Sequence, residues 1–177
     1  MMLNLFPVLL VIASTQVLQP VVIRTPELEL ELTPRTPNQI ASFYEARGFP
    51  KSMLQVIRQQ CYITFGITNN SDQIVWLELS NWEFSASGKP LKREHRDYWK
   101  KRWADMGIPL SKQSTFRWTL IPETLDYLPG EHEGGNILLP FTRDQLTLKA
   151  TFATGEQKRG KPVIITTDRL FCAEDAP

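Results

Sequence analysis

Alternation of hydrophobic and polar residues is the dominant pattern in this chain of 177 residues. The clearest case is 27–32, which reads E-L-E-L-E-L and predicts a half-buried strand with its leucines inward. A second alternating strand is expected to start at Cys61. Further short strands are expected at 74–79, 82–84, 115–121, 137–139, 146–152 and 163–171. Short antiparallel strands separated by turns predict a mainly β fold, an antiparallel β-sandwich.

Turn-forming residues between these strands suggest how they connect. The polar run 69–72 predicts a tight turn, so 61–79 is expected to form a β-hairpin. The segment 122–135 is rich in proline, glycine and acidic residues and is expected to be a loop. Trp118 alternates with Phe116 and Leu120, which predicts that all three lie in the core.

Two segments have helical rather than strand periodicity and are expected to be insertions, at 37–59 and 92–106. In the first, Thr36 and Gln39 form a capping box around Pro37, Gly48 ends one helix and Pro50 begins another. The second carries an apolar stripe at helical spacing, made of Leu91, His95, Tyr98, Trp99, Trp103 and Met106.

Two short motifs resemble those of bacterial immunoglobulin-like sandwich domains. The run 62–72 is similar to their hydrophobic strand followed by an N-x-S-D turn. The residues 128–131, L-P-G-E, followed by G-N-I at 135–137, resemble a strand connection of that family. The resemblance covers about half the chain and implies an immunoglobulin-like β-sandwich. It implies no activity, because this architecture hosts many functions.

The N-terminus resembles a secretory signal peptide. Residues 1–14 carry no charged side chain, and their apolar stretch is shorter than the 17–25 residues that cross a bilayer. Cleavage after Ala13 would give a signal peptide at 1–13, a linker at 14–26 and a single β-sandwich domain at 27–177. The alternative is a buried or anchoring N-terminal helix, and only then would the chain associate with a membrane. Export to the periplasm or the extracellular space is expected.

Two cysteines, Cys61 and Cys172, stand at the start and the end of the strand set. In an exported protein a lone pair is expected to form one disulfide. The alternative is two buried free thiols in a reduced protein.

The segment 89–102 contains seven Lys or Arg residues interleaved with aromatic residues. One reading is a basic amphipathic helix that binds a protein or another envelope component. This predicted interaction surface comprises Lys92, Arg93, Arg96, Trp99, Lys100, Lys101 and Trp103. The other reading is a helix whose aromatic stripe packs on the sheet. Trp82, Trp99 and Trp103 are the tryptophans that could be exposed and form a carbohydrate-binding face. The favoured alternative is that these large side chains fill the core. A net charge of +1 gives no overall positive field that would attract nucleic acid, so nucleic acid is not expected as a partner.

Metal ligation has few candidate residues. His95, Glu131, His132 and Glu133 are the candidates, but they have no recognised ligand spacing. We therefore predict no metal and no cofactor.

The absence of nucleophile and phosphate-binding motifs predicts a non-catalytic module. We therefore expect an exported binding or assembly module of the cell envelope. The alternative is a secreted hydrolytic or metal-dependent enzyme that uses the loop 131–133. Glu123 and Asp126 are a further possible acid–base pair, although acidic residues in loops are usually solvated.

Overall fold

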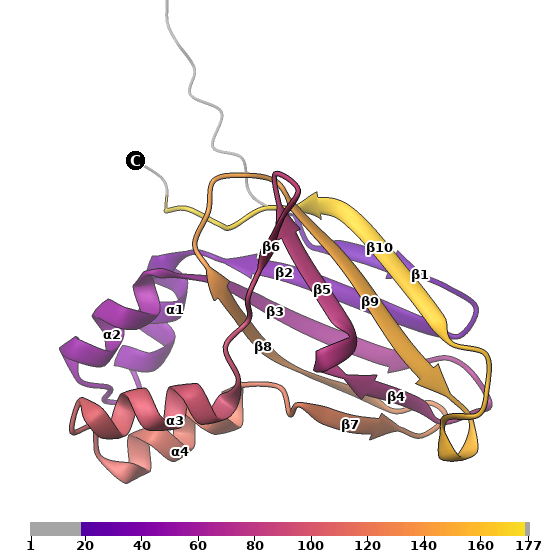
Figure 1. Ribbon diagram of the computed structural model, residues 1–177. Helices are drawn as coiled ribbons and strands as arrows, with labels where there is room; N and C mark the ends of the chain where they lie inside the picture. The colour runs from indigo at the N-terminus through magenta and orange to yellow at the C-terminus, as the bar shows by residue number, and fades with distance from the viewer. Residues whose placement is uncertain (1–18, 176–177) are drawn as a thin grey trace, which may run out of the picture.

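The computed structural model describes residues 19–175 as two antiparallel sheets that face each other, with helices gathered at one end (Figure 1). The fold is therefore mainly β, as predicted. The four-stranded sheet has the order β1 (Val21–Arg24), β2 (Leu28–Arg35), β3 (Gln60–Asn69) and β8 (His132–Pro140). The six-stranded sheet has the order β6 (Lys89–Leu91), β5 (Trp82–Ala86), β9 (Leu146–Thr154), β4 (Val75–Glu78) and β7 (Thr124–Tyr127), with β10 (Val163–Leu170) paired to β9.

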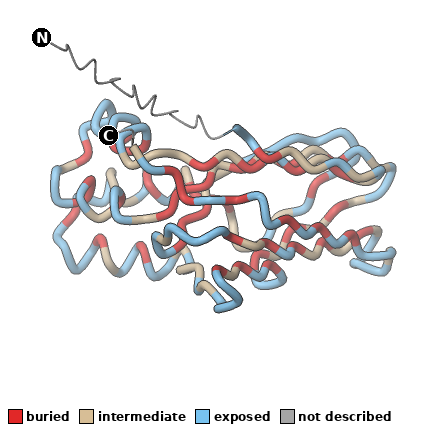
Figure 2. The backbone as a smooth tube through the Cα atoms, turned by 90° about the horizontal axis from the view of Figure 1, so that it is seen from above, coloured by how far each residue is buried: buried red, intermediate tan, exposed pale blue. Residues whose placement is uncertain are grey.

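The main core fills the space between the two sheets. Leu28, Leu30 and Leu32 of β2 are fully buried there, which confirms the period-two prediction. On the other sheet, Phe152 and Trp82 pack edge to face with ring centroids 5.4 Å apart. In Figure 2 the buried residues lie mainly within the molecule and the exposed ones at its turns and rim. No helix within residues 19–175 is long and apolar enough to span a bilayer.

The first strand lies in a segment predicted to be a linker. Residues 14–26 contain β1, which pairs antiparallel with β2 from Val21 opposite Leu32 to Arg24 opposite Glu29. Four residues are too few for a strong periodic pattern, so the sequence signal was missed. The proposed signal peptide at 1–13 lies outside the described residues.

The predicted hairpin 61–79 is wrong. β3 and β4 belong to different sheets, and the segment between them is an arch that crosses the sandwich. Asn69, fully buried at the end of β3, shapes this arch: its side-chain nitrogen donates to the carbonyl oxygens of Gln73 at 2.7 Å and Tyr127 at 2.9 Å. Its side-chain oxygen accepts from the backbone N–H of Ser71. A buried asparagine with its hydrogen bonds satisfied can hold a crossover that composition alone reads as a tight turn.

The predicted loop 122–135 is also wrong, because it contains β7 and the first residues of β8. Gly130 stands in the turn between these strands with a φ of +80°, whereas Gly134 and Gly135 allow close backbone approach. A Cβ atom on Gly135 would lie 2.8 Å from the backbone nitrogen of Ile121, and one on Gly134 would collide with the carbonyl oxygen of Phe65. Glycine inside a strand marks such contacts.

Four helices form a helical lobe at one end of the sandwich (Figure 1). They are α1 (Pro37–Glu45), α2 (Lys51–Arg58), α3 (Arg96–Asp105) and α4 (Leu110–Thr119). The first three confirm the predicted helical segments, and α1 has the predicted capping box. The lobe has its own core on the outer face of the four-stranded sheet, and this core includes Tyr62 of β3 and Leu138 of β8.

A chain of hydroxyl groups joins the lobe to the sheet. Thr119 donates its hydroxyl hydrogen to the carbonyl oxygen of Phe116 at 2.7 Å, so it must accept from Tyr44, whose hydroxyl lies 2.6 Å away. Tyr44 in turn accepts from the hydroxyl of Tyr62. Burial raises the pKa of both tyrosines, so these hydroxyls stay protonated.

The strand predicted at 115–121 is instead the second half of α4 and the two residues that follow it. Phe116 and Leu120 are buried at a spacing of four residues, which suits one face of a helix. Trp118, predicted to be core, is 83% exposed on the other side. A short run with aromatic residues at every second position fits both periods, and here the packing of α4 against α3 decided for the helix.

The C-terminal segment is tied to the start of β3. Cys61 and Cys172 form a disulfide with Cα atoms 5.1 Å apart, which matches the predicted pairing. The side chain of Asp175 then accepts from the backbone N–H of Asn38 in the first turn of α1, at 2.9 Å. Asp175, the last described residue, therefore lies against the helical lobe.

The disulfide is expected to contribute strongly to stability. It closes a loop over a separation of 111 residues, for which the chain-entropy model gives about 4–5 kcal/mol. Replacing both cysteines by alanine should lower the free energy of unfolding by about that amount, as measured by urea denaturation. Wild-type protein unfolded in the presence of reductant is the control. A loss below about 1 kcal/mol would contradict the expectation.

Candidate functional site

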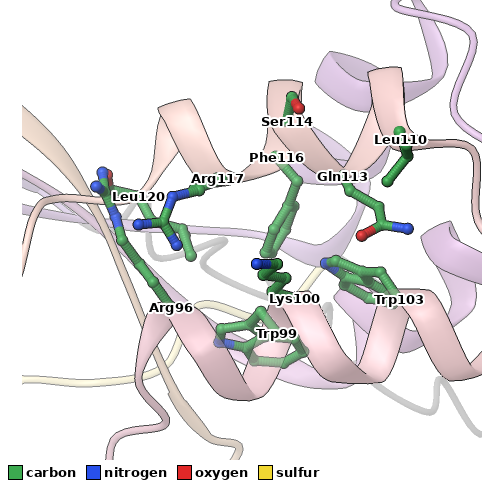
Figure 3. A pocket seen from close by; sticks show the side chains of 10 residues that line it. All are labelled: Arg96, Trp99, Lys100, Trp103, Leu110, Gln113, Ser114, Phe116, Arg117 and Leu120. Carbon is green, nitrogen blue, oxygen red and sulfur yellow. The ribbon is translucent and has the colours of Figure 1, made fainter.

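The helical lobe has a groove between α3 and α4 (Figure 3). The two helices are joined by the short turn 106–109, in which Gly107 has a φ of +67° that favours glycine. The groove encloses about 100 Å³. Its lining consists of Arg96, Trp99, Lys100 and Trp103 from α3, and Leu110, Gln113, Ser114, Phe116, Arg117 and Leu120 from α4 and its end.

Three aromatic rings form the floor of the groove. Trp99 and Trp103 stack with centroids 5.4 Å apart, and Phe116 meets both rings edge on. All three side chains are at most 3% exposed. The reading that placed Trp99 and Trp103 on an open surface is therefore wrong, as it is for Trp82, which lies in the main core.

The rest of the predicted apolar stripe is less buried than its helical spacing suggested. Tyr98 and Met106 are more than one third exposed, and Leu91 belongs to β6 rather than to the helix. α3 begins only at Arg96, with His95 as its N-cap residue. Only Trp99 and Trp103 of the stripe are core residues.

The walls of the groove are positively charged. Arg96, Lys100 and Arg117 line it, and no carboxylate does. Arg117 has a contact of 3.5 Å with Asp97, but both side chains are largely exposed, so this pair contributes little. Burial and the nearby charge of Arg117 lower the pKa of Arg96, although Glu123 opposes the shift.

Two buried hydrogen-bond donors in the groove have no partner. Within residues 19–175, Arg96 Nε and Trp103 Nε1 are buried nitrogen atoms without an acceptor, although the Nη2 of Arg96 donates to the carbonyl oxygen of Leu120. Trp82 Nε1 and the hydroxyl of Tyr127 in the main core are also without a partner. Arg96 and Trp103 lie seven residues apart on α3, which corresponds to about 10 Å along a helix. In Figure 3 they stand toward opposite ends of the groove. The groove therefore combines an apolar floor with an excess of donors and positive charge.

Glu123 gathers the basic residues just outside the groove. Its carboxylate accepts hydrogen bonds from both Nη groups of Arg93 and from the backbone N–H of Arg96, the latter at 3.2 Å. One carboxylate oxygen also lies 3.4 Å from Nδ1 of His95. Burial alone would raise the pKa of Glu123. The hydrogen bonds and charge of Arg93, with smaller contributions from Arg96 and His95, lower it overall. Arg93 is thus neutralised and is not available to a partner.

The structure brings together four residues of the predicted interaction surface and separates the other three. Arg96, Trp99, Lys100 and Trp103 line the groove. Lys92 and Lys101 lie outside it, with Glu94 and Asp105 as their neighbours, and Arg93 is bound to Glu123. The residues from α4 were missed because that segment was predicted to be a strand. The spacing of four residues between the apolar residues Phe116 and Leu120 was the sequence signal that could have indicated a helix.

The metal-ligand candidates do not assemble. His132 Nδ1 lies 2.9 Å from the hydroxyl of Thr68, and Glu131 accepts from the backbone N–H of Leu128. His95 contacts Glu123 at the start of α3 instead. The described part of the chain holds no group of three histidine, cysteine or acidic residues that could bind a metal ion. The enzyme alternative based on 131–133 therefore gains no support from the geometry.

No family model and no curated protein matches the chain. Among solved structures, it is similar to a putative lipoprotein, ycdA, from Bacillus subtilis, with a TM-score of 0.43 and 10% sequence identity. The match covers 83% of this chain and 38% of the lipoprotein chain. A likeness of this degree assigns neither a fold family nor a function.

Two tryptophans offer a matched test of the floor of the groove. Trp103→Ala should lower the free energy of unfolding by about 3–5 kcal/mol, because removing a buried aromatic side chain leaves a cavity. Trp118→Ala should change it by less than about 0.5 kcal/mol, because that ring is exposed. Urea denaturation of both variants measures the difference. Equal effects of the two substitutions would contradict the described packing.

The Glu123 cluster predicts a pH dependence. The lowered pKa of Glu123 means that its contacts stabilise the fold above the unfolded-state value of about 4.3, and that this stabilisation is lost as the pH falls through the folded-state value. Glu123→Gln should therefore be less stable than wild type at pH 7, with a smaller difference at pH 3. Glu83→Gln, which removes an exposed carboxylate, is the control. A difference for Glu123→Gln that is independent of pH would refute this assignment.

Proposed function

We propose that this protein is an exported, non-catalytic binding module of the cell envelope, and that the groove between α3 and α4 holds a segment of a partner protein. The segment would carry acidic groups beside one large apolar side chain. The observation that carries the proposal is the pair of unpartnered buried donors, Arg96 Nε and Trp103 Nε1, in a groove without carboxylates.

The energetics of these donors favour an occupant with acceptor oxygens. A buried donor left without a partner costs about 1–3 kcal/mol. A carboxylate or backbone carbonyl that reached either donor from the groove would remove that cost, and a carboxylate would also offset the mutual repulsion of Arg96 and Arg117. Hydrogen bonds between guanidinium groups and carboxylates are among the stronger ones in proteins.

The size of the groove favours a protein segment over a sugar or a lipid. A hollow of about 100 Å³ accepts one side chain, not an acyl chain. A sugar platform needs an open aromatic face, whereas Trp99 and Trp103 are almost completely buried. Leu110 is 78% exposed at the rim, where it could contact the apolar side chain of such a segment.

Export is supported by independent features. The Cys61–Cys172 disulfide suits an oxidising compartment, and the uncharged apolar N-terminus suits secretion. The proposal includes export to the periplasm or to the extracellular space. It also includes an immunoglobulin-like form of the sandwich. A membrane contact belongs to the proposal only if the N-terminal segment is retained.

Selection from a random-peptide display library tests the groove directly. Wild-type protein should enrich peptides in which Asp or Glu stands beside a large apolar residue. For a peptide so selected, Lys100→Gln with Arg117→Gln should weaken binding at least tenfold by calorimetry, because two cations of the wall are removed. Leu110→Ser should also weaken it, through loss of the apolar rim.

The matched control removes two cations outside the groove, Lys92→Gln with Lys101→Gln. This variant should bind the peptide as wild type does. Equal losses in the two double variants would point to general charge attraction and contradict the proposal. Enrichment of peptides without acidic residues would contradict it as well.

A further inference from the structure

A second hollow lies between α1 and the outer face of the four-stranded sheet. It encloses about 320 Å³, within the size range of small-molecule sites. Its lining residues are Arg35 of β2, Gln39, Ile40, Phe43 and Tyr44 of α1, Tyr62 and Thr64 of β3, and Asn136 of β8. None of them is used by the proposed partner groove.

Arg35 is held in place by a relay of hydrogen bonds across three strands. Its Nε donates to the hydroxyl of Thr64 at 3.1 Å, and that hydroxyl donates to the side-chain oxygen of Asn136 at 2.8 Å. Asn136 completes the relay by donating from its side-chain nitrogen to the carbonyl oxygen of Thr119 at 2.7 Å. The guanidinium group is therefore oriented before any ligand arrives.

The binding edge of Arg35 has no partner. Within residues 19–175 no carboxylate lies within ion-pair distance of it, and its two Nη groups make no hydrogen bond. No carboxylate lines the hollow either. The neighbouring hydroxyls of Tyr44 and Tyr62 remain neutral, because burial raises the pKa of both. An anion would meet no negative charge among these lining groups.

The opposite wall is apolar. Ile40 and Phe43 project from α1, and Phe43 remains 39% exposed. The guanidinium of Arg47 covers a face of the Phe43 ring at 3.6 Å and so holds the ring in position. Arg47 itself does not line the hollow.

We propose that this hollow binds a small organic acid, with its carboxylate on the Nη edge of Arg35 and its apolar body against Ile40 and Phe43. Planar guanidinium groups match carboxylates with two parallel hydrogen bonds. The hollow has the volume for a ring or a short branched chain beside that contact. The inference is independent of the partner groove.

Titration with benzoate and its uncharged analogue benzamide tests the proposal, with amide chemical shifts of isotope-labelled protein as the readout. Benzoate should shift the amides of α1, β3 and β8 and bind about tenfold or more tightly than benzamide, as loss of a charged hydrogen bond implies. Arg35→Gln should abolish that preference. Arg47→Gln, which removes an equal charge beside the hollow, should retain it.

Further arms examine the relay and the apolar wall. Thr64→Val breaks the contact to Arg35 Nε and should weaken benzoate binding, and Phe43→Ala should weaken benzoate and benzamide alike. Inorganic phosphate should bind more weakly than benzoate, because it lacks an apolar body. The proposal is overturned if benzoate and benzamide bind equally, if phosphate equals benzoate, if Arg35→Gln and Arg47→Gln behave alike, or if the shifts fall elsewhere.

Discussion

The outer face of the four-stranded sheet is apolar at one end, and the helical lobe covers this end. Tyr62 and Leu138 stand opposite each other on β3 and β8 and point away from the main core, yet both are at most 3% exposed. Burying such side chains stabilises a fold by about 1.5–3 kcal/mol each. Once covered, the Tyr62 hydroxyl needs a partner, and the chain through Tyr44 to Thr119 supplies one. This single requirement brings α1 and α4 against the same strand.

That arrangement also creates both hollows. α4 contributes Phe116 to the floor of the groove, while Thr119 at its end anchors the relay that orients Arg35. The groove and the second hollow therefore share one helix as a common support. A shift of α4 along its axis would alter the spacing between Phe116 and the α3 tryptophans, and it would also break the contact between Thr119 and Asn136. Both proposed sites therefore depend on the position of α4, although they have no lining residue in common.

The sequence predicted the parts of the fold that follow from local pattern. β2 was clear because one of its faces is buried along its whole length, and α1 because its capping box is a local signal. The arch after Asn69 and the α4 helix were misread because each depends on a distant partner: the carbonyl of Tyr127 in one case, the α3 tryptophans in the other. Because α4 was not predicted, the residues that it contributes to the groove were not identified from the sequence. The residues of α3 were identified because this helix concentrates its charge within one short segment.

Arg93 and Arg96 show which charges serve folding and which remain for a partner. They lie three residues apart, and both approach Glu123. The side chain of Arg93 is neutralised by that carboxylate and is only 12% exposed. Arg96 presents only its backbone N–H to Glu123, and its own Nε is left buried without an acceptor. Among the described residues, the guanidinium of Arg96 is held only by the carbonyl oxygen of Leu120, to which its Nη2 donates, and an unpartnered buried donor such as its Nε destabilises the fold. Glu123 therefore pairs with Arg93, and Arg96 keeps an unpartnered Nε toward one end of the groove while Trp103 keeps an unpartnered indole nitrogen toward the other, so only an occupant that spans the groove could meet both.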